Sequence, residues 1–199
     1  DGDAITAACF ALHTLVTRSN ASVITIPVHM IQVLCEAFVA HESRGMASTM
    51  FRLATCTAEM LTVVLPSASS SSIRYVTNTT LLQRLCVRTD RVPYRRVLTC
   101  RILLSYLRLI HMVLEHPALT DSSLRVDVIE VVRQYLYRWA SLIVDMSADA
   151  GSYKVAKVMI AIAAHVFASG IENMHVLHLG ALSASLVTCM NVFAEHRKV

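Results

Sequence analysis

The stretch between residues 97 and 114 constrains this chain most, because nearly all of its side chains are apolar. The polar exceptions, with the residue that follows the stretch, recur at helical spacing: Arg101, Ser105, Arg108 and Glu115. Residues spaced in this way lie within one narrow strip of an α-helix. A helix that is apolar on its other sides must be covered there by other helices. We therefore expect residues 97–114 to form the central helix of an all-α domain.

An apolar period of about 3.6 residues recurs along the rest of the chain. In all, the pattern predicts about eight helices, at residues 3–18, 25–43, 47–65, 73–88, 93–115, 124–146, 153–171 and 173–194. Taken in order, these helices make four antiparallel hairpins, and residues 93–146 form the central one. Trp139 lies in the middle of an apolar stripe, so we expect it to be buried against the central helix.

Pro66 ends the third predicted helix, and a run of serine and alanine follows it. Small polar residues of this kind are typical of flexible connections. The sequence therefore predicts a loop at residues 66–72, with residues 67–72 as its most mobile part.

The composition fits a domain with extensive buried surface. The chain has 199 residues and a mass of 22.0 kDa, which suits a single domain, and it begins without an initiator methionine. It is 55% hydrophobic but only 16% charged, against a usual quarter or so, and its mean hydropathy is +0.53. We expect residues 1–199 to be one domain cut from a longer protein. A membrane-associated protein is the alternative, although residues 158–171 fall short of the ~20 residues of a spanning helix and residues 176–194 contain polar side chains.

The cysteines and the absence of catalytic motifs point away from secretion and catalysis. Six cysteines are scattered through apolar helical runs without a CxxC pair, which is typical of buried free thiols in a reducing compartment. The sequence has no phosphate-cradling glycine loop and lacks GxSxG, HExxH and GxGxxG. We therefore predict a cytoplasmic or nuclear protein that is not an enzyme and has no cofactor.

Two pairs of side chains have the spacing of metal ligands. His175 and His178 lie one helical turn apart, but no further ligand is close in sequence except Glu172 in the preceding turn. His111 and Glu115 are also one turn apart, and an ion pair explains them. His165 lies in an apolar run, where a packed neutral histidine is expected. The sequence thus predicts no metal site.

Arginine is concentrated in one short segment. Six arginines with Asp90 as the only acid give residues 84–101 a charge of +5, and the cluster comprises Arg84, Arg88, Arg91, Arg95, Arg96 and Arg101. Guanidinium groups suit forked hydrogen bonds to carboxylate or phosphate. Three interpretations stay open: a solvated turn with local ion pairs, a site for an acidic peptide, and a nucleic-acid site.

The last predicted helix has apolar residues around more than one face and no Asp, Glu, Lys or Arg between residues 173 and 194. The terminal helix of a helical stack is expected to have a polar outer side. We predict that this outer side is covered by a second copy, a partner helix or a further element of the parent chain. The residues of the predicted apolar interface are Val176, Leu179, Gly180, Ala184, Val187 and Phe193.

The predicted hairpins start near residues 3, 46, 93 and 150, so they repeat at intervals of roughly 40–57 residues, close to the period of helical-hairpin repeats. The segment Leu119–Arg125, with Asp121 at the turn and Arg125 early in the next helix, resembles a HEAT-repeat turn. In architecture the chain is similar to the HEAT/armadillo family. That resemblance implies a right-handed α-solenoid, with a compact helical bundle as the alternative, and a binding scaffold without catalytic residues.

These observations favour a non-catalytic protein–protein interaction domain of a larger intracellular protein. Its expected partner is a helix or an acidic peptide, with a homo-oligomer through the C-terminal helix as a further prediction. An RNA- or DNA-binding domain that uses the arginine cluster is the alternative. A steep fall of affinity with salt would identify nucleic acid.

Overall fold

The computed structural model describes residues 2–18, 48–77, 96–119, 123–144 and 150–168, with isolated positions between 29 and 36 and between 180 and 194. Apart from Ala68, Ser69 and His116 these residues are helical, and none of them is in a strand, which confirms the predicted all-α class. The described α-helices are α1 (Gly2–Arg18), α3 (Ser48–Val64), α4 (Ser70–Thr77), α6 (Arg96–Glu115), α7 (Ser123–Val144) and α8 (Ala150–Ala168). Two short 3-10 helices are η2 (Leu65–Ser67) and η3 (Pro117–Leu119).

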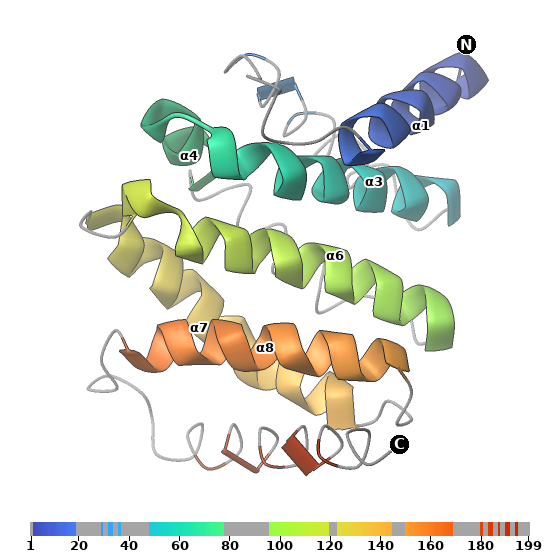
Figure 1. Cartoon of the computed structure of the whole chain (residues 1–199). Coiled ribbons are helices and arrows are strands. Elements are labelled where there is room, and N and C mark those ends of the chain that lie inside the picture. The colour runs from blue at the N-terminus through green and yellow to red at the C-terminus, as the bar shows by residue number, and fades with distance from the viewer. Residues whose placement is uncertain are drawn as a thin grey trace.

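Helices that are not adjacent in sequence lie side by side (Figure 1). α1 packs on α3, α3 on α6, and α6 on α8, so these four helices contact one another in that order. α7 packs mainly against α8 and contacts its neighbour in sequence, α6, at far fewer residues. The expectation that other helices cover α6 is confirmed, but α3 and α8 supply most of that cover.

The core follows α6 along its length. Its fully or almost fully buried apolar side chains are Ile102, Leu103, Tyr106, Leu107, Leu109, Ile110 and Val113. They belong to one buried cluster with side chains of α3 such as Leu61 and of α8 such as Met159. Complete burial of a leucine or isoleucine contributes about 1.5–3 kcal/mol, so packing on both sides of α6 dominates the stability of the fold. Most of the polar strip of α6 is exposed, as its spacing predicts, and only Ser105 is buried.

The serine run forms less of a loop than the sequence predicts. Pro66 lies within η2, where the amide of Ala68 donates a hydrogen bond to the carbonyl oxygen of Leu65. α4 begins at Ser70, and the carbonyl oxygen of Ser69 accepts the amide hydrogen of Ile73. Serine suits the first turn of a helix. The burial of Ile73 favours a helix over this segment. The predicted loop at residues 67–72 is therefore wrong in its extent, and only Ala68 and Ser69 lie between the two helices.

Other expectations fall on positions outside the described residues. They include most of the predicted helices at 25–43 and 173–194, the part of the predicted helix at 73–88 beyond Thr77, and the side chain of Trp139. The count of eight helices and their pairing as hairpins therefore stay predictions. Within the described ranges, no helix combines the length and the apolar character needed to cross a bilayer.

Candidate functional site

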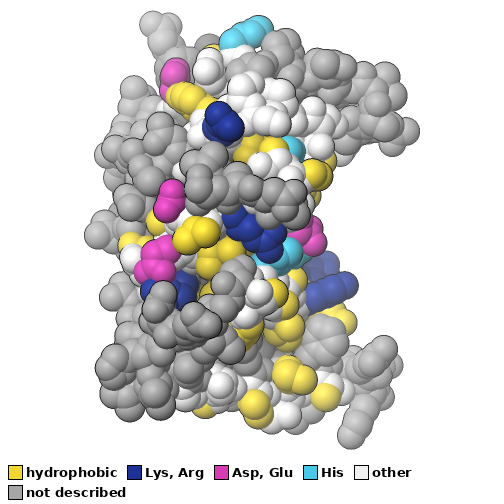
Figure 2. Space-filling model, turned by 90° about the vertical axis from the view of Figure 1, so that its left-hand side faces the viewer, with side chains coloured by type: hydrophobic (Ala, Val, Ile, Leu, Met, Phe, Trp, Pro, Cys, Tyr) yellow, Lys and Arg dark blue, Asp and Glu magenta, His cyan; other side chains and the backbone are white. Residues whose placement is uncertain are grey.

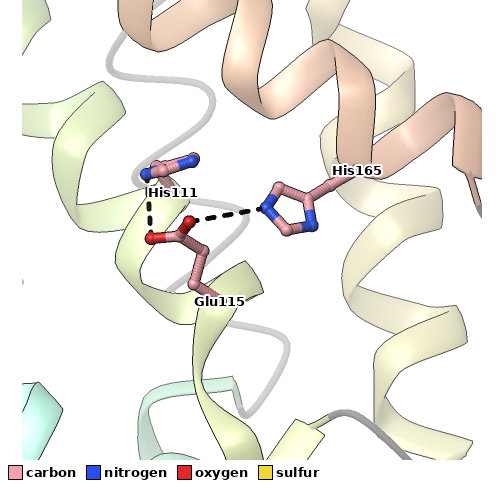
Figure 3. Close-up of side chains that lie close together, drawn as sticks. All are labelled: His111, Glu115 and His165. Atoms are coloured by element: carbon pink, nitrogen blue, oxygen red, sulfur yellow. Dashed lines mark ion pairs between the residues drawn. The ribbon is translucent and has the colours of Figure 1, made fainter.

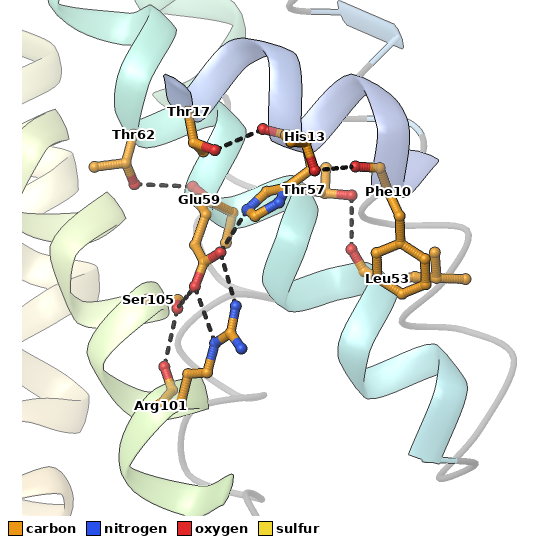
Figure 4. A network of polar contacts seen from close by, with 11 residues as sticks. Phe10, His13, Thr17, Leu53, Thr57, Glu59, Thr62, Arg101 and Ser105 are labelled. Carbon is orange, nitrogen blue, oxygen red and sulfur yellow. Dashed lines mark hydrogen bonds and ion pairs between the residues drawn. The ribbon is translucent and has the colours of Figure 1, made fainter. Parts of the chain in front are cut away.

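Two polar clusters lie where α6 meets its neighbours, one toward each end of its polar strip. The first is the Glu59 clamp, which we define as His13, Glu59, Arg101 and Ser105 (Figure 4). The Nε2 atom of His13 on α1 lies 2.6 Å from Glu59 Oε2 on α3. From α6, Arg101 donates to both carboxylate oxygens at 3.4 Å, and Ser105 Oγ donates to Glu59 Oε1 at 3.0 Å. One carboxylate thus joins three helices.

The surroundings of Glu59 keep it ionised. Burial raises the pKa of its carboxyl group, but hydrogen bonds from Arg101, His13 and Ser105 and the positive charge of Arg101 lower it, and the net pKa is below the ordinary 4.5. A half-buried carboxylate with these partners has most of its hydrogen-bonding capacity in use. The Glu59 clamp is therefore suited to holding helices together.

The second cluster, here called the histidine cluster, consists of His111, Glu115 and His165 (Figure 3). His111 Nδ1 lies 3.4 Å from Glu115 Oε2, one helical turn away on α6. His165 reaches in from α8 and places its Nε2 atom 3.9 Å from Glu115 Oε1. The two imidazole rings are 5.5 Å apart at 64°, and one ligand atom from each of the three side chains lies within 4.8 Å of the others.

Burial lowers the pKa of His111, the charge of Glu115 raises it, and His165 lowers it again, so the net pKa is below the ordinary 6.5. His111 is therefore mostly neutral at neutral pH, with a nitrogen lone pair available. Two imidazoles and a carboxylate are ligand types that bind borderline transition metals. The carboxylate of Glu115 is 50% exposed, so the cluster is open to solvent on one side.

Sequence reasoning found only part of the histidine cluster. The one-turn pair of His111 and Glu115 is present, but His165 is half-buried beside them and not enclosed among core side chains. Nothing in the local pattern identifies His165 as their neighbour, because the packing of α8 on α6 brings it there.

Most of the predicted arginine cluster lies outside the described residues, including Arg84, Arg88, Arg91 and Arg95. Arg96 begins α6, but its side chain is not among those described. Arg101 is described: its side chain is 62% exposed, yet its guanidinium group binds Glu59. On the face in Figure 2, described acidic and basic side chains lie close together at mid-height, with hydrophobic side chains among them.

Three of the six residues of the predicted C-terminal interface are described. Gly180, Ala184 and Val187 are helical and exposed, whereas Val176, Leu179 and Phe193 lie outside the described residues. The described positions of this segment are all exposed and carry no formal charge: Gly180, Ser183, Ala184, Val187, Met190, Asn191 and Ala194. We call these seven residues the C-terminal face. Val187 is 56% exposed and Met190 59%, and a Cβ atom added to Gly180 would meet no atom within 4 Å.

Comparison with protein-family models, with curated proteins and with solved structures finds no match to this chain.

Proposed function

We propose that the chain is a non-catalytic protein-interaction module that binds an apolar helix through its C-terminal face. The observation that carries the proposal is this uncharged helical face, on which Val187 and Met190 are more than half exposed. The module would belong to a larger intracellular protein. The free thiol of Cys9 fits a reducing compartment.

The stacking of helices supports a solenoid-like architecture of the HEAT/armadillo kind. α1, α3, α6 and α8 contact one another in that order, while α7 lies beside the stack against α8. In a helical-hairpin solenoid, each repeat likewise contacts only its neighbours. Such a stack has two ends, and each end must either be polar or be covered.

Two described exposed parts of the chain differ in charge. Between residues 29 and 36, the described exposed positions include His29 and Glu36 as well as Val33. The C-terminal face has no charged side chain, although exposed helix surfaces are normally polar. The small residues Gly180 and Ala184 allow another helix to approach closely, since the distance between packed helices depends on the side chains at the contact.

A second copy of the chain suits this face best. The face offers no charge that would select a partner of opposite charge, and a twofold interface requires a surface that is complementary to itself. The arginine segment is a weaker basis for function, because Arg101, its one member with a described side chain, already binds a carboxylate of the same chain.

The test is to place charge on the C-terminal face by changing Val187→Glu and Met190→Glu together. The wild-type chain is expected to associate in sedimentation equilibrium, because burying the apolar face releases it from water. The double variant is expected to be monomeric with an unchanged melting temperature. Val126→Glu is the matched control, because Val126 is 69% exposed on α7. A monomeric wild-type chain, or equal disruption by Val126→Glu, would contradict the proposal.

Binding of nucleic acid would be the other outcome. If the wild-type chain stays monomeric but retains RNA with a steep dependence on salt, the arginine segment carries the function and the C-terminal face does not.

A further inference from the structure

At the contact between α6 and α8, two imidazole nitrogens and a carboxylate converge on one small volume (Figure 3). We propose that His111, Glu115 and His165 bind a divalent transition-metal ion of the zinc class, which links α6 to α8 and keeps one coordination position open. This site goes beyond the proposed interaction function and does not depend on it.

The spacing of the donor atoms supports the site. Zinc lies about 2.0–2.2 Å from histidine nitrogen and carboxylate oxygen, so two ligand atoms of a tetrahedral site are about 3.3–3.5 Å apart. The 3.4 Å between His111 Nδ1 and Glu115 Oε2 already has this length. The remaining separations, 3.9 Å from His165 Nε2 to Glu115 Oε1 and at most 4.8 Å within the group, need only small side-chain rotations. The carboxylate has room to move, since it is half exposed.

The ligand types select the metal. Imidazole nitrogen suits Zn²⁺, Co²⁺, Ni²⁺ and Cu²⁺, whereas Mg²⁺ and Ca²⁺ take sets of oxygen ligands. Two histidines and a glutamate, with water in the fourth position, form a known open zinc ligand set. An ionised Glu115 leaves one positive charge on a Zn²⁺ complex with two neutral imidazoles.

The cluster is a poor ion pair but a good ligand set. Strong charge-assisted hydrogen bonds between nitrogen and carboxylate are about 2.7–2.9 Å long, yet Glu115 meets its histidines at 3.4 and 3.9 Å. The distances within the cluster therefore fit a bound metal ion better than an ion pair.

Binding would fix the position of α8 on α6, because the ligands come from both helices. The side chain of Glu115 is 50% exposed, so water or a donor atom of another molecule can reach the site.

The experiment titrates the metal-free 199-residue chain with Zn²⁺ and with Co²⁺, and compares wild type with His165→Gln and Glu115→Gln. We expect one ion per chain, and each substitution should weaken binding by at least about tenfold, because changes even in the outer shell have effects of this size. The matched controls are His29→Gln and Glu130→Gln, which alter an exposed histidine and an exposed glutamate elsewhere and should bind like wild type. At 100 times the dissociation constant, Zn²⁺ should raise the melting temperature by about 5–10 °C.

The Co²⁺ absorption spectrum identifies the ligands. A tetrahedral spectrum without thiolate charge transfer is expected, since the site contains no cysteine. A thiolate band, equal affinity of His165→Gln and His29→Gln, equal binding of Mg²⁺, or no saturable binding would each overturn the proposal. Circular dichroism shows whether the His165→Gln variant folds. If it does not, Glu115→Gln still tests the site, because it changes an exposed side chain.

Discussion

The Glu59 clamp and the histidine cluster are two versions of one arrangement. In both, a glutamate lies at a contact of α6 with another helix, and a histidine from a different helix approaches it: His13 of α1 approaches Glu59 of α3, and His165 of α8 approaches Glu115 of α6. Glu59 also binds the guanidinium group of Arg101 and the hydroxyl group of Ser105. Among the described residues, Glu115 contacts two histidines, both at longer distances than the 2.6 Å from His13 to Glu59.

The difference shows that a glutamate at a helix contact can serve either structure or binding, depending on its partners. Arginine is always charged, so the Glu59 clamp is complete without any further component. Imidazole is mostly neutral near pH 7 and can offer a lone pair, so the histidine cluster can accept an ion. The Glu59 clamp is thus suited to structure, and the histidine cluster to binding.

The largest effect should come from removing the carboxylate of the Glu59 clamp. We expect Glu59→Ala to lower the free energy of unfolding by about 1–3 kcal/mol, because it leaves half-buried His13 without its acceptor, whereas Ser105 keeps the carbonyl oxygen of Arg101. Urea unfolding followed by circular dichroism measures this loss. Glu115→Ala, measured in the presence of a chelator, is the matched comparison and should lower the free energy of unfolding far less. Equal losses in the two variants would contradict the distinction between the two clusters.

A double-mutant cycle isolates the contribution of the arginine. Arg101 is mostly exposed and lies 3.4 Å from Glu59, so we expect a coupling free energy of about 0.5–1 kcal/mol between Glu59→Gln and Arg101→Gln. The cycle is measured by urea unfolding at low and at high salt. A coupling that does not weaken in high salt would contradict this assignment, because exposed charges are screened.

The two clusters should affect stability in different pH ranges. The pKa of His111 is lower in the folded chain than the ordinary 6.5, mainly through burial, although Glu115 opposes the shift and His165 adds to it. Below pH 6.5 the unfolded chain therefore takes up a proton that the folded chain does not. The free energy of unfolding consequently decreases as the pH is lowered. The pKa of Glu59 is lowered from 4.5, so the stability that it contributes is present above pH 4.5 and is lost below it.

Urea midpoints measured in chelator between pH 7.5 and 3.5 test these directions. His111→Gln should reduce the loss between pH 7 and 5.5, and Glu59→Gln should reduce the loss below pH 4.5. An unchanged pH profile in either variant would show that the group does not titrate as described.

The smallest effect should follow Glu115→Gln in the absence of metal. The side chain is half exposed and its contacts are long, so we expect a change of less than about 0.5 kcal/mol in the free energy of unfolding. Thermal and urea unfolding in chelator measure it. A large loss would mean that the histidine cluster is a structural ion pair, like the Glu59 clamp.

The sequence alone determined the local features of this chain. The strip from Arg101 to Glu115 predicts α6 and its exposed side, and Pro66 predicts the end of α3, since helical period and proline geometry depend on residues within a few positions. The serine run was harder to assign, because small polar residues suit both a loop and the first turn of a helix. The burial of Ile73 and Val76 in the core decided for the helix from Ser70 onward.

Only the tertiary structure decided which side chains meet. His13 and Arg101 reach Glu59 from 46 and 42 residues away along the chain. His165 likewise meets His111 and Glu115 only because α8 packs on α6, although α7 lies between them in sequence. Apolar periodicity predicts which side of each helix is buried, but the apolar sides of many helices are similar. The choice among them depends on how side chains of the whole core interlock, and that is not encoded in any local pattern.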